Sequence, residues 1–114
     1  LSLHDALPIL RGGDEWMAAV NKDIDRNRHL VTELVNQFLP GAKYTPVEAT
    51  YLAWVDCRAL GLGDDPGQVF LEKGKVAFSS GHVFGQGGEG HIRVNMATSP
   101  EILTEAFRRA SLAL

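Results

Sequence analysis

One run of helical periodicity sets the first limit on what this chain can fold into. Apolar residues recur at the three- and four-residue spacing of a single helix face, at Trp16, Val20, Ile24, Val31, Leu34, Val35 and Phe38. Asp14, followed by Glu15, is the expected N-cap, and Pro40-Gly41 ends the run. A helix over residues 14–39 would have about 25 residues and a length of roughly 37 Å. That is long for a chain of 114 residues, and such a helix usually braces something larger.

The rest of the chain alternates strand and helix signals. Asp65 caps a short helix with Pro66 at its first position, and Ser99-Pro100-Glu101 opens the last one, with Ile102, Leu103, Ala106, Phe107 and Ala110 on one face. The expected elements are a strand at 50–56, a helix at 65–74, a strand at 75–78, a strand at 91–97 and a final helix from Ser99.

Composition places the chain among ordinary folded domains. It is 45% hydrophobic and 22% charged, and its 11 basic and 14 acidic residues give a net charge of −3, which leaves no basic footprint for nucleic acid. No apolar run reaches the roughly 20 residues of a membrane span, and no signal peptide is visible, so a cytoplasmic protein is the default expectation. Cys57 is the only cysteine, which excludes an internal disulfide.

The first nine residues are not expected to belong to the folded domain. Leu1 to Ile9 resembles one translated reading frame of a common sequencing-adapter oligonucleotide, and we expect this segment to be an artefact or disordered. The domain is therefore expected to cover residues 10–114.

A glycine-rich loop runs directly into the strand at 91–97, which carries one strong charge. Ile92, Val94 and Met96 share one face of this strand, whereas Arg93 lies on the other face between two polar neighbours. Burying an arginine in a strand costs several kcal/mol of desolvation free energy unless an anion pairs with its charge. Two roles for Arg93 stay open. It could bind the carboxylate of a ligand, or it could form a structural ion pair with Glu89 or Glu48.

Other candidate sites favour simpler explanations. The glycine loop lacks the strand-before, helix-after context of a nucleotide-binding loop. His82 and His91 have no third metal ligand nearby, and Cys57 is expected to be a small core residue. Tyr51 and Trp54 could stack on a planar ligand, but aromatic residues in a central strand are usually core.

Four segments in order resemble the carboxy-terminal part of class I/II aminotransferase-fold enzymes, and specifically the cystathionine β-lyase type of C–S lyase. They are Gly12-Gly13-Asp14-Glu15-Trp16 with Asn27-Arg28, Ala49 to Asp56, Glu72-Lys73-Gly74-Lys75-Val76, and Phe84-Gly85 through Asn95. The resemblance implies an α+β fold of two layers, the small domain of a fold-type I pyridoxal-phosphate enzyme. A long interdomain helix at about 14–39 would accompany a small, mainly antiparallel sheet with helices on one side.

The resemblance also implies roles for particular residues. Arg93 matches the arginine that binds the substrate α-carboxylate, and Asn95, Tyr51, Gly87 and Gly88 are its expected supporting residues. Two positions depart from the family pattern, namely Ala49, where glycine is frequent, and His91, where an aromatic residue is common. These departures bear on substrate preference.

No catalytic residue is assigned in this chain. The lysine that forms the Schiff base with pyridoxal 5′-phosphate and the groups that bind the phosphate belong to the large domain, so this chain alone is expected to be inactive. The intact parent is expected to be a homodimeric C–S β-lyase that acts on amino acids. The alternatives are an aminotransferase and, in a different class, a stand-alone small-molecule binding module in which Arg93 holds an effector carboxylate.

Overall fold

The computed structural model describes residues 3–114, which form a helical arm and a compact α+β body. Four-stranded and antiparallel throughout, the sheet has the order β1-β2-β4-β3. In chain order the elements are α1 (Leu3–Gly12), α2 (Asp14–Phe38), β1 (Lys43–Tyr44), β2 (Leu52–Asp56), η1 (Arg58–Leu60), α3 (Pro66–Val69), η2 (Phe70–Gly74), β3 (Ser79–Ser80), η3 (Gly81–Phe84), β4 (His91–Asn95) and α4 (Pro100–Ser111). The two-layer α+β prediction is confirmed.

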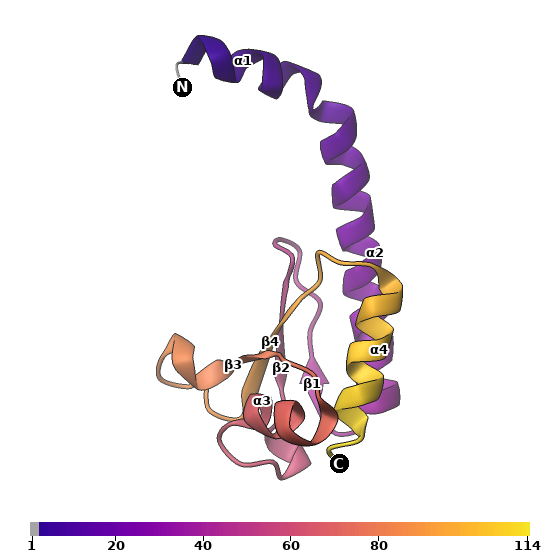
Figure 1. The fold of residues 1–114 in the computed structure, drawn as a ribbon, viewed down its shortest axis with the longest axis vertical. Helices are drawn as coiled ribbons and strands as arrows, with labels where there is room; N and C mark the ends of the chain where they lie inside the picture. Colours follow the sequence, from indigo (N-terminus) through magenta and orange to yellow (C-terminus); the bar gives the residue numbers. More distant parts are fainter. Residues whose placement is uncertain (1–2) are drawn as a thin grey trace.

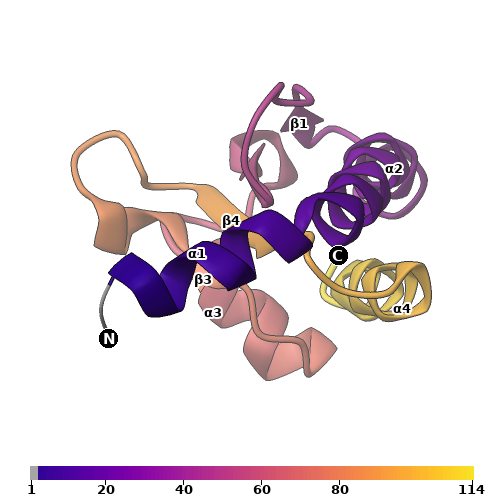
Figure 2. The ribbon, with the colours of Figure 1, turned by 90° about the horizontal axis from the view of Figure 1, so that it is seen from above.

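Helix α2 runs the full predicted length, but its fully buried residues all lie in its second half. Its buried residues are Asn27, Val31, Leu34 and Val35, whereas Trp16 and Met17 are 66% and 50% exposed. Figure 1 shows the first half of α2 rising past the sheet, with α1 bent away at its top. The apolar stripe is therefore continuous in sequence and covered only where α4 and the sheet lie beside it (Figures 1 and 2).

The start of the chain differs from two expectations. Gly13, without a side-chain hydrogen bond, is the N-cap of α2, and Asp14 is the first helical residue, where its charge suits the positive end of the helix dipole. Residues 3–12 form helix α1, so the expected disorder of residues 1–9 is not what the structure describes from Leu3 onward. Residues 1–2 lie outside the described part, and the adapter origin of the segment stays a prediction.

The short helix after β2 follows the predicted capping. The Asp65 carboxylate accepts a hydrogen bond from Gln68 N at 3.1 Å, and Pro66 is the first helical residue. The chain then makes one π-helical turn, η2, and leaves it at Lys75, whose φ of 55° is left-handed. Because Val76 N is bonded back to Phe70 O, the predicted strand at 75–78 is wrong, and pairing with β4 begins at Ser79.

One face of the sheet forms the core with the helices. Ala53, Val55, Ile92 and Val94 lie on it, each at most 3% exposed, and we call this the closed face. α2 and α4 cover it side by side (Figure 2). Ser99 caps α4 through Ile102 N as predicted, and Leu103, Phe107 and Ala110 enter the core, although Ile102 stays 61% exposed. Among the described residues no helix is both long and apolar enough to cross a membrane.

Candidate functional site on the open face of the sheet

Arg93 lies in the middle of β4 on the face that the helices leave uncovered. Its Cα pairs with Trp54 on β2 and with Ser79 on β3, so it stands at the centre of the sheet. The strand alternates as predicted, with Ile92 and Val94 directed into the core and Arg93 directed away from it. We call this second surface the open face, and its residues are Leu52, Trp54, Asp56, His91, Arg93 and Asn95.

Three rings lie in contact on this face, and one of them contacts Arg93. The guanidinium carbon of Arg93 is 4.2 Å from the centroid of the Phe84 ring. Phe84 meets Trp54 edge-on at 6.2 Å between centroids, and Trp54 stacks on His91 at 5.2 Å. We call Phe84, Trp54 and His91 the aromatic row. Trp54 is 39% exposed and Tyr51 48% exposed, so the expectation that both are core residues is wrong: the helices cover only the opposite face of the sheet.

Arg93 has no anionic partner among residues 3–114. Neither Glu89 nor Glu48 forms an ion pair with it, and the Glu89 carboxylate instead accepts a hydrogen bond from Gly87 N at 3.1 Å. The Arg93 guanidinium likewise makes no hydrogen bond within the described part of the chain. The ion-pair interpretation therefore finds no support, and the N–H donors of Arg93 are available to a ligand.

His91 makes one ring hydrogen bond and lies near a carboxylate. Its Nδ1 lies 2.8 Å from the Glu89 carbonyl oxygen, and because a carbonyl only accepts, Nδ1 carries the proton. Its Nε2 lies 3.8 Å from the Asp56 carboxylate. Hydrogen bonds from the Arg58 guanidinium, at 2.8 and 3.0 Å, hold the pKa of Asp56 well below its usual range. Asp56 is therefore a carboxylate at neutral pH and places a negative charge near the His91 ring.

The glycine-rich loop brings Phe84 and His91 to the same side of the sheet. Gly85, Gly87 and Gly90 have positive φ values, which other residues adopt with difficulty. Gly88 is buried where its backbone meets that of Gly81, and a Cβ on either residue would overlap the other's backbone. The two predicted loop residues thus differ, because Gly87 is exposed and Gly88 is a packing position.

The remaining predicted supporting residues lie around Arg93 without touching it. Asn95 is exposed on the open face, and its Oδ1 accepts a hydrogen bond from Ala97 N at 2.8 Å, which ends the strand. Tyr51 precedes β2, and its carbonyl oxygen accepts from Met96 N at 2.7 Å. Both residues therefore shape the ends of the two central strands.

Cys57 and the histidines form no reactive centre in the described residues. Cys57 is 1% exposed, as predicted for a core residue, and burial, with a smaller contribution from Asp56, raises its pKa to about 12. His82 Nδ1 lies 3.8 Å from the Asp65 carboxylate. Within residues 3–114 there is no group of three or more metal-ligating side chains.

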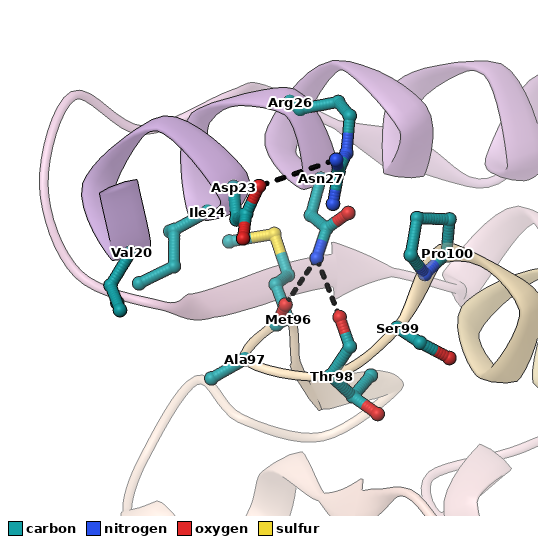
Figure 3. A pocket seen from close by; sticks show the side chains of 10 residues that line it. All are labelled: Val20, Asp23, Ile24, Arg26, Asn27, Met96, Ala97, Thr98, Ser99 and Pro100. Carbon is teal, nitrogen blue, oxygen red and sulfur yellow. Dashed lines mark hydrogen bonds and ion pairs between the residues drawn. The ribbon is translucent and has the colours of Figure 1, made fainter. Parts of the chain in front are cut away.

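A hollow of about 390 Å³ lies between α2 and the connection from β4 to α4 (Figure 3). Asn27, 1% exposed, donates from Nδ2 to the carbonyl oxygens of Met96 and Thr98, both at 2.8 Å. Its Oδ1 is buried without a partner in the described structure. Asn27 thus ties α2 to the chain segment that leaves the Arg93 strand.

Asn27 and Phe84 both belong to segments that carry the resemblance, but the sequence assigns neither of them a contact. Asn27 has a signal, because it lies between Ile24 and Val31 on the apolar face of α2, where a polar side chain must find partners. The contact of Phe84 with Arg93 depends on the path of the glycine-rich loop. Nothing in the local sequence specifies that path.

The described residues do not fit pyridoxal phosphate itself. All four lysines, Lys22, Lys43, Lys73 and Lys75, are exposed, and only Lys43 lies on the open-face side of the sheet, on the edge strand β1 opposite Asp56. The N-termini of α3 and α4 are capped by Asp65 and Ser99 and so do not offer a free phosphate cradle. The open face instead presents the N–H donors of the Arg93 guanidinium.

No family model matches this chain, whereas individual proteins match it clearly. A Mycobacterium tuberculosis protein described as "Putative cystathionine beta-lyase" is 44% identical over 91% of this chain and 30% of its own length. A pyridoxal-phosphate-bound "putative aminotransferase" from Clostridium difficile has a TM-score of 0.85 and 36% identity, covering 90% of this chain and 27% of its own. A "putative plp-dependent beta-cystathionase" from Corynebacterium diphtheriae has a TM-score of 0.82 and 39% identity, covering 89% and 27%.

The fold, the open-face arginine and these matches define the class, which is the C-terminal small domain of the pyridoxal-phosphate-dependent aminotransferase fold. Within that class the chain is similar to proteins described as cystathionine beta-lyases. It spans about 30% of the length of the curated relatives that it matches.

Proposed function

We propose that this chain supplies the substrate-carboxylate site of a pyridoxal-phosphate-dependent C–S β-lyase that acts on amino acids. The observation that carries the proposal is Arg93, a central-strand arginine on the open face with no anionic partner in residues 3–114. The similarity to proteins named cystathionine beta-lyase supports the reaction class. The coenzyme, the electron sink for such reactions, would be held by residues outside this chain.

Arg93 would act by fixing the carboxylate of the substrate. A guanidinium can donate two parallel hydrogen bonds to the two oxygens of one carboxylate, which sets both position and orientation. The rigid centre of the sheet holds the arginine, and the aromatic row excludes water from one side of it. Orienting the substrate in this way lowers the barrier without any proton transfer by this chain.

A second candidate function is amino-group transfer to a keto acid. The match to the Clostridium difficile aminotransferase favours it, because the carboxylate site would serve both reactions equally. A stand-alone carboxylate-binding module is the third candidate. A longer reading frame that contains a large domain upstream would favour either enzyme over the module.

The deciding experiment compares two reactions of the longer parent protein. It is assayed with L-cystathionine for release of thiol, pyruvate and ammonia, and separately with an amino donor plus a keto acid. We expect the first reaction to be the faster one. Faster amino transfer would reject the lyase assignment, and no turnover of either kind would favour the binding module.

The role of Arg93 is tested in the same protein with Arg93→Lys. This change keeps the positive charge but removes the planar guanidinium that can donate two parallel hydrogen bonds. We expect kcat/KM to fall at least about tenfold, which corresponds to about 1.4 kcal/mol, with the coenzyme still bound. Arg108→Lys is the matched control, because Arg108 lies on the exposed side of α4 and pairs with Glu105. Equal effects of the two changes would remove the carboxylate assignment.

This chain alone is expected to show no turnover and no stable internal aldimine at one specific lysine, because the lysine that forms the Schiff base in this class is expected in the large domain and the four lysines here are all exposed. Borohydride reduction followed by mass spectrometry checks this. A homodimeric, cytoplasmic parent remains part of the proposal, and analytical ultracentrifugation of the parent tests the dimer.

A further inference from the structure

Phe84 makes the closest described contact to the Arg93 guanidinium. It is the last residue of η3, it is 49% exposed, and its ring centroid lies 4.2 Å from the guanidinium carbon. An exposed phenylalanine gains little from burial at this position, so packing alone does not explain it. The contact places an aromatic face against the cation and leaves the N–H donors of Arg93 without protein partners.

The backbone around Phe84 is held firmly enough to fix the ring. Gly85 N donates to the His82 carbonyl at 3.3 Å, and Gly88 N donates to the Gly85 carbonyl at 3.1 Å. The loop is anchored at its far end, where Gly90 N donates to the Asp64 carbonyl at 2.8 Å. These bonds place the backbone of Phe84, and the contacts of the ring with Arg93 and Trp54 set its direction.

The side of the ring away from Arg93 is supported as well. Trp54 meets Phe84 edge-on and stacks on His91, and His91 Nδ1 is hydrogen-bonded to the Glu89 carbonyl. A continuous line of contacts thus runs from Glu89 through the aromatic row to the guanidinium. Each member restricts the next one, so the orientation of Arg93 depends on more than its own rotamer.

We propose that Phe84 is a positioning residue that orients the Arg93 guanidinium for a substrate carboxylate. This inference rests on the proposed function of Arg93. Phe84 touches the arginine, and it acts on the substrate only through it. Loss of the ring should therefore weaken carboxylate binding while the chemical step stays nearly unchanged.

The test is a double-mutant cycle in the longer parent protein with L-cystathionine as substrate. Phe84→Leu keeps an apolar side chain and removes the π face, and we expect KM to rise about two- to fivefold with kcat nearly constant. Phe84→Tyr keeps the face and should stay near the parent value. In an Arg93→Lys background Phe84→Leu should add little, because its effect passes through the arginine. Val83→Ala, at an exposed neighbour on η3, is the matched control and should change nothing.

A crystal structure of Phe84→Leu gives a readout besides turnover, in which the Arg93 guanidinium should leave its present position. Unchanged KM and an unmoved Arg93 in Phe84→Leu would overturn the inference, as would additive effects in the cycle. If Arg93→Lys alone leaves kcat/KM normal, the proposed function itself fails. That result is distinct from a normal Phe84→Leu beside an impaired Arg93→Lys, which removes only the role of Phe84.

Discussion

The two faces of the sheet are built from the same two central strands and treat their side chains in opposite ways. On the closed face Ala53, Val55, Ile92 and Val94 meet helices of their own chain and are at most 3% exposed. On the open face Trp54 is 39% exposed and Arg93 is partly exposed without an anionic partner in the described residues. We therefore expect the closed face to contribute most of the stability of this chain. The open face presents a charged group, Arg93, that has no anionic partner in the described residues.

The same division runs along α2. Its second half packs on the closed face, whereas Trp16 and Met17 in its first half stand clear of the body (Figure 1). Exposed aromatic and apolar side chains of this size usually mark an interaction surface. Both uncovered regions are consistent with a chain that spans about 30% of its relatives.

The largest effect expected from the comparison is loss of a closed-face anchor. Phe107→Ala empties a fully buried site on α4 beside Phe78, and we expect it to lower the free energy of unfolding by about 3–5 kcal/mol. Trp54→Ala removes a larger ring from the open face and should cost less than half as much, because that ring is already partly in water. Urea unfolding followed by circular dichroism measures both. Equal losses of unfolding free energy would mean that the two faces contribute equally to stability.

The second effect concerns the hydrogen bonds that join α2 to the end of the Arg93 strand. Asn27→Ala leaves the Met96 and Thr98 carbonyl oxygens without their donor, and we expect the free energy of unfolding to fall by about 1–3 kcal/mol. Asn21→Ala on the exposed part of α2 is the control and should be close to neutral. If Asn27→Ala leaves the free energy of unfolding unchanged, burying the unpartnered Oδ1 destabilises the fold by as much as the two hydrogen bonds stabilise it.

The closed face was the more predictable of the two, and the reason is physical. Periodicity reports burial, so the alternation around Arg93 and the apolar stripe of α2 were visible in the sequence. Periodicity does not report what covers a face, and Tyr51 and Trp54 were therefore assigned to a core that lies on the other side of the sheet. The error at residues 75–78 has a similar origin, because a π turn and a left-handed Lys75 follow from tertiary packing and have no local signature.

The site was predictable only as far as one residue and its motif. Arg93 stood out because a charge interrupts an apolar strand, and Asn95 followed from the same strand. The aromatic row could not be foreseen, since Trp54, Phe84 and His91 come from three elements that the glycine loop brings together. The three rings are separated in the sequence and come into contact only in the folded chain.

A smaller effect should appear on acidification, at the β3 end of the sheet. The Ser80 hydroxyl donates to Asp65 at 2.6 Å, and this bond is the main reason that the pKa of Asp65 lies below its usual range. A depressed carboxyl pKa stabilises the fold above the ordinary value near 3.8, and that stability is lost as pH falls through the folded-state pKa. Ser80→Ala should therefore lower stability at pH 7 and flatten its decline as the pH falls below the ordinary value near 3.8. Ser79→Ala is the control, and parallel pH curves for Ser80→Ala and the parent would contradict this account.

The smallest effect on stability is expected where the largest effect on function is proposed. Arg93→Lys breaks no ion pair and no hydrogen bond of the described structure, and it weakens one cation–π contact that is worth about 0.5–1 kcal/mol at an exposed site. We therefore expect the free energy of unfolding in urea to change by less than about 1 kcal/mol. Phe84→Leu should change it by a similar amount, since it removes the other half of the same contact. If Arg93→Lys instead unfolds the chain, the open face is structural, Arg93 has an anionic partner that stabilises the fold, and its assignment to a substrate carboxylate is wrong. A stable variant with impaired turnover in the parent would place stability on one face of the sheet and recognition on the other.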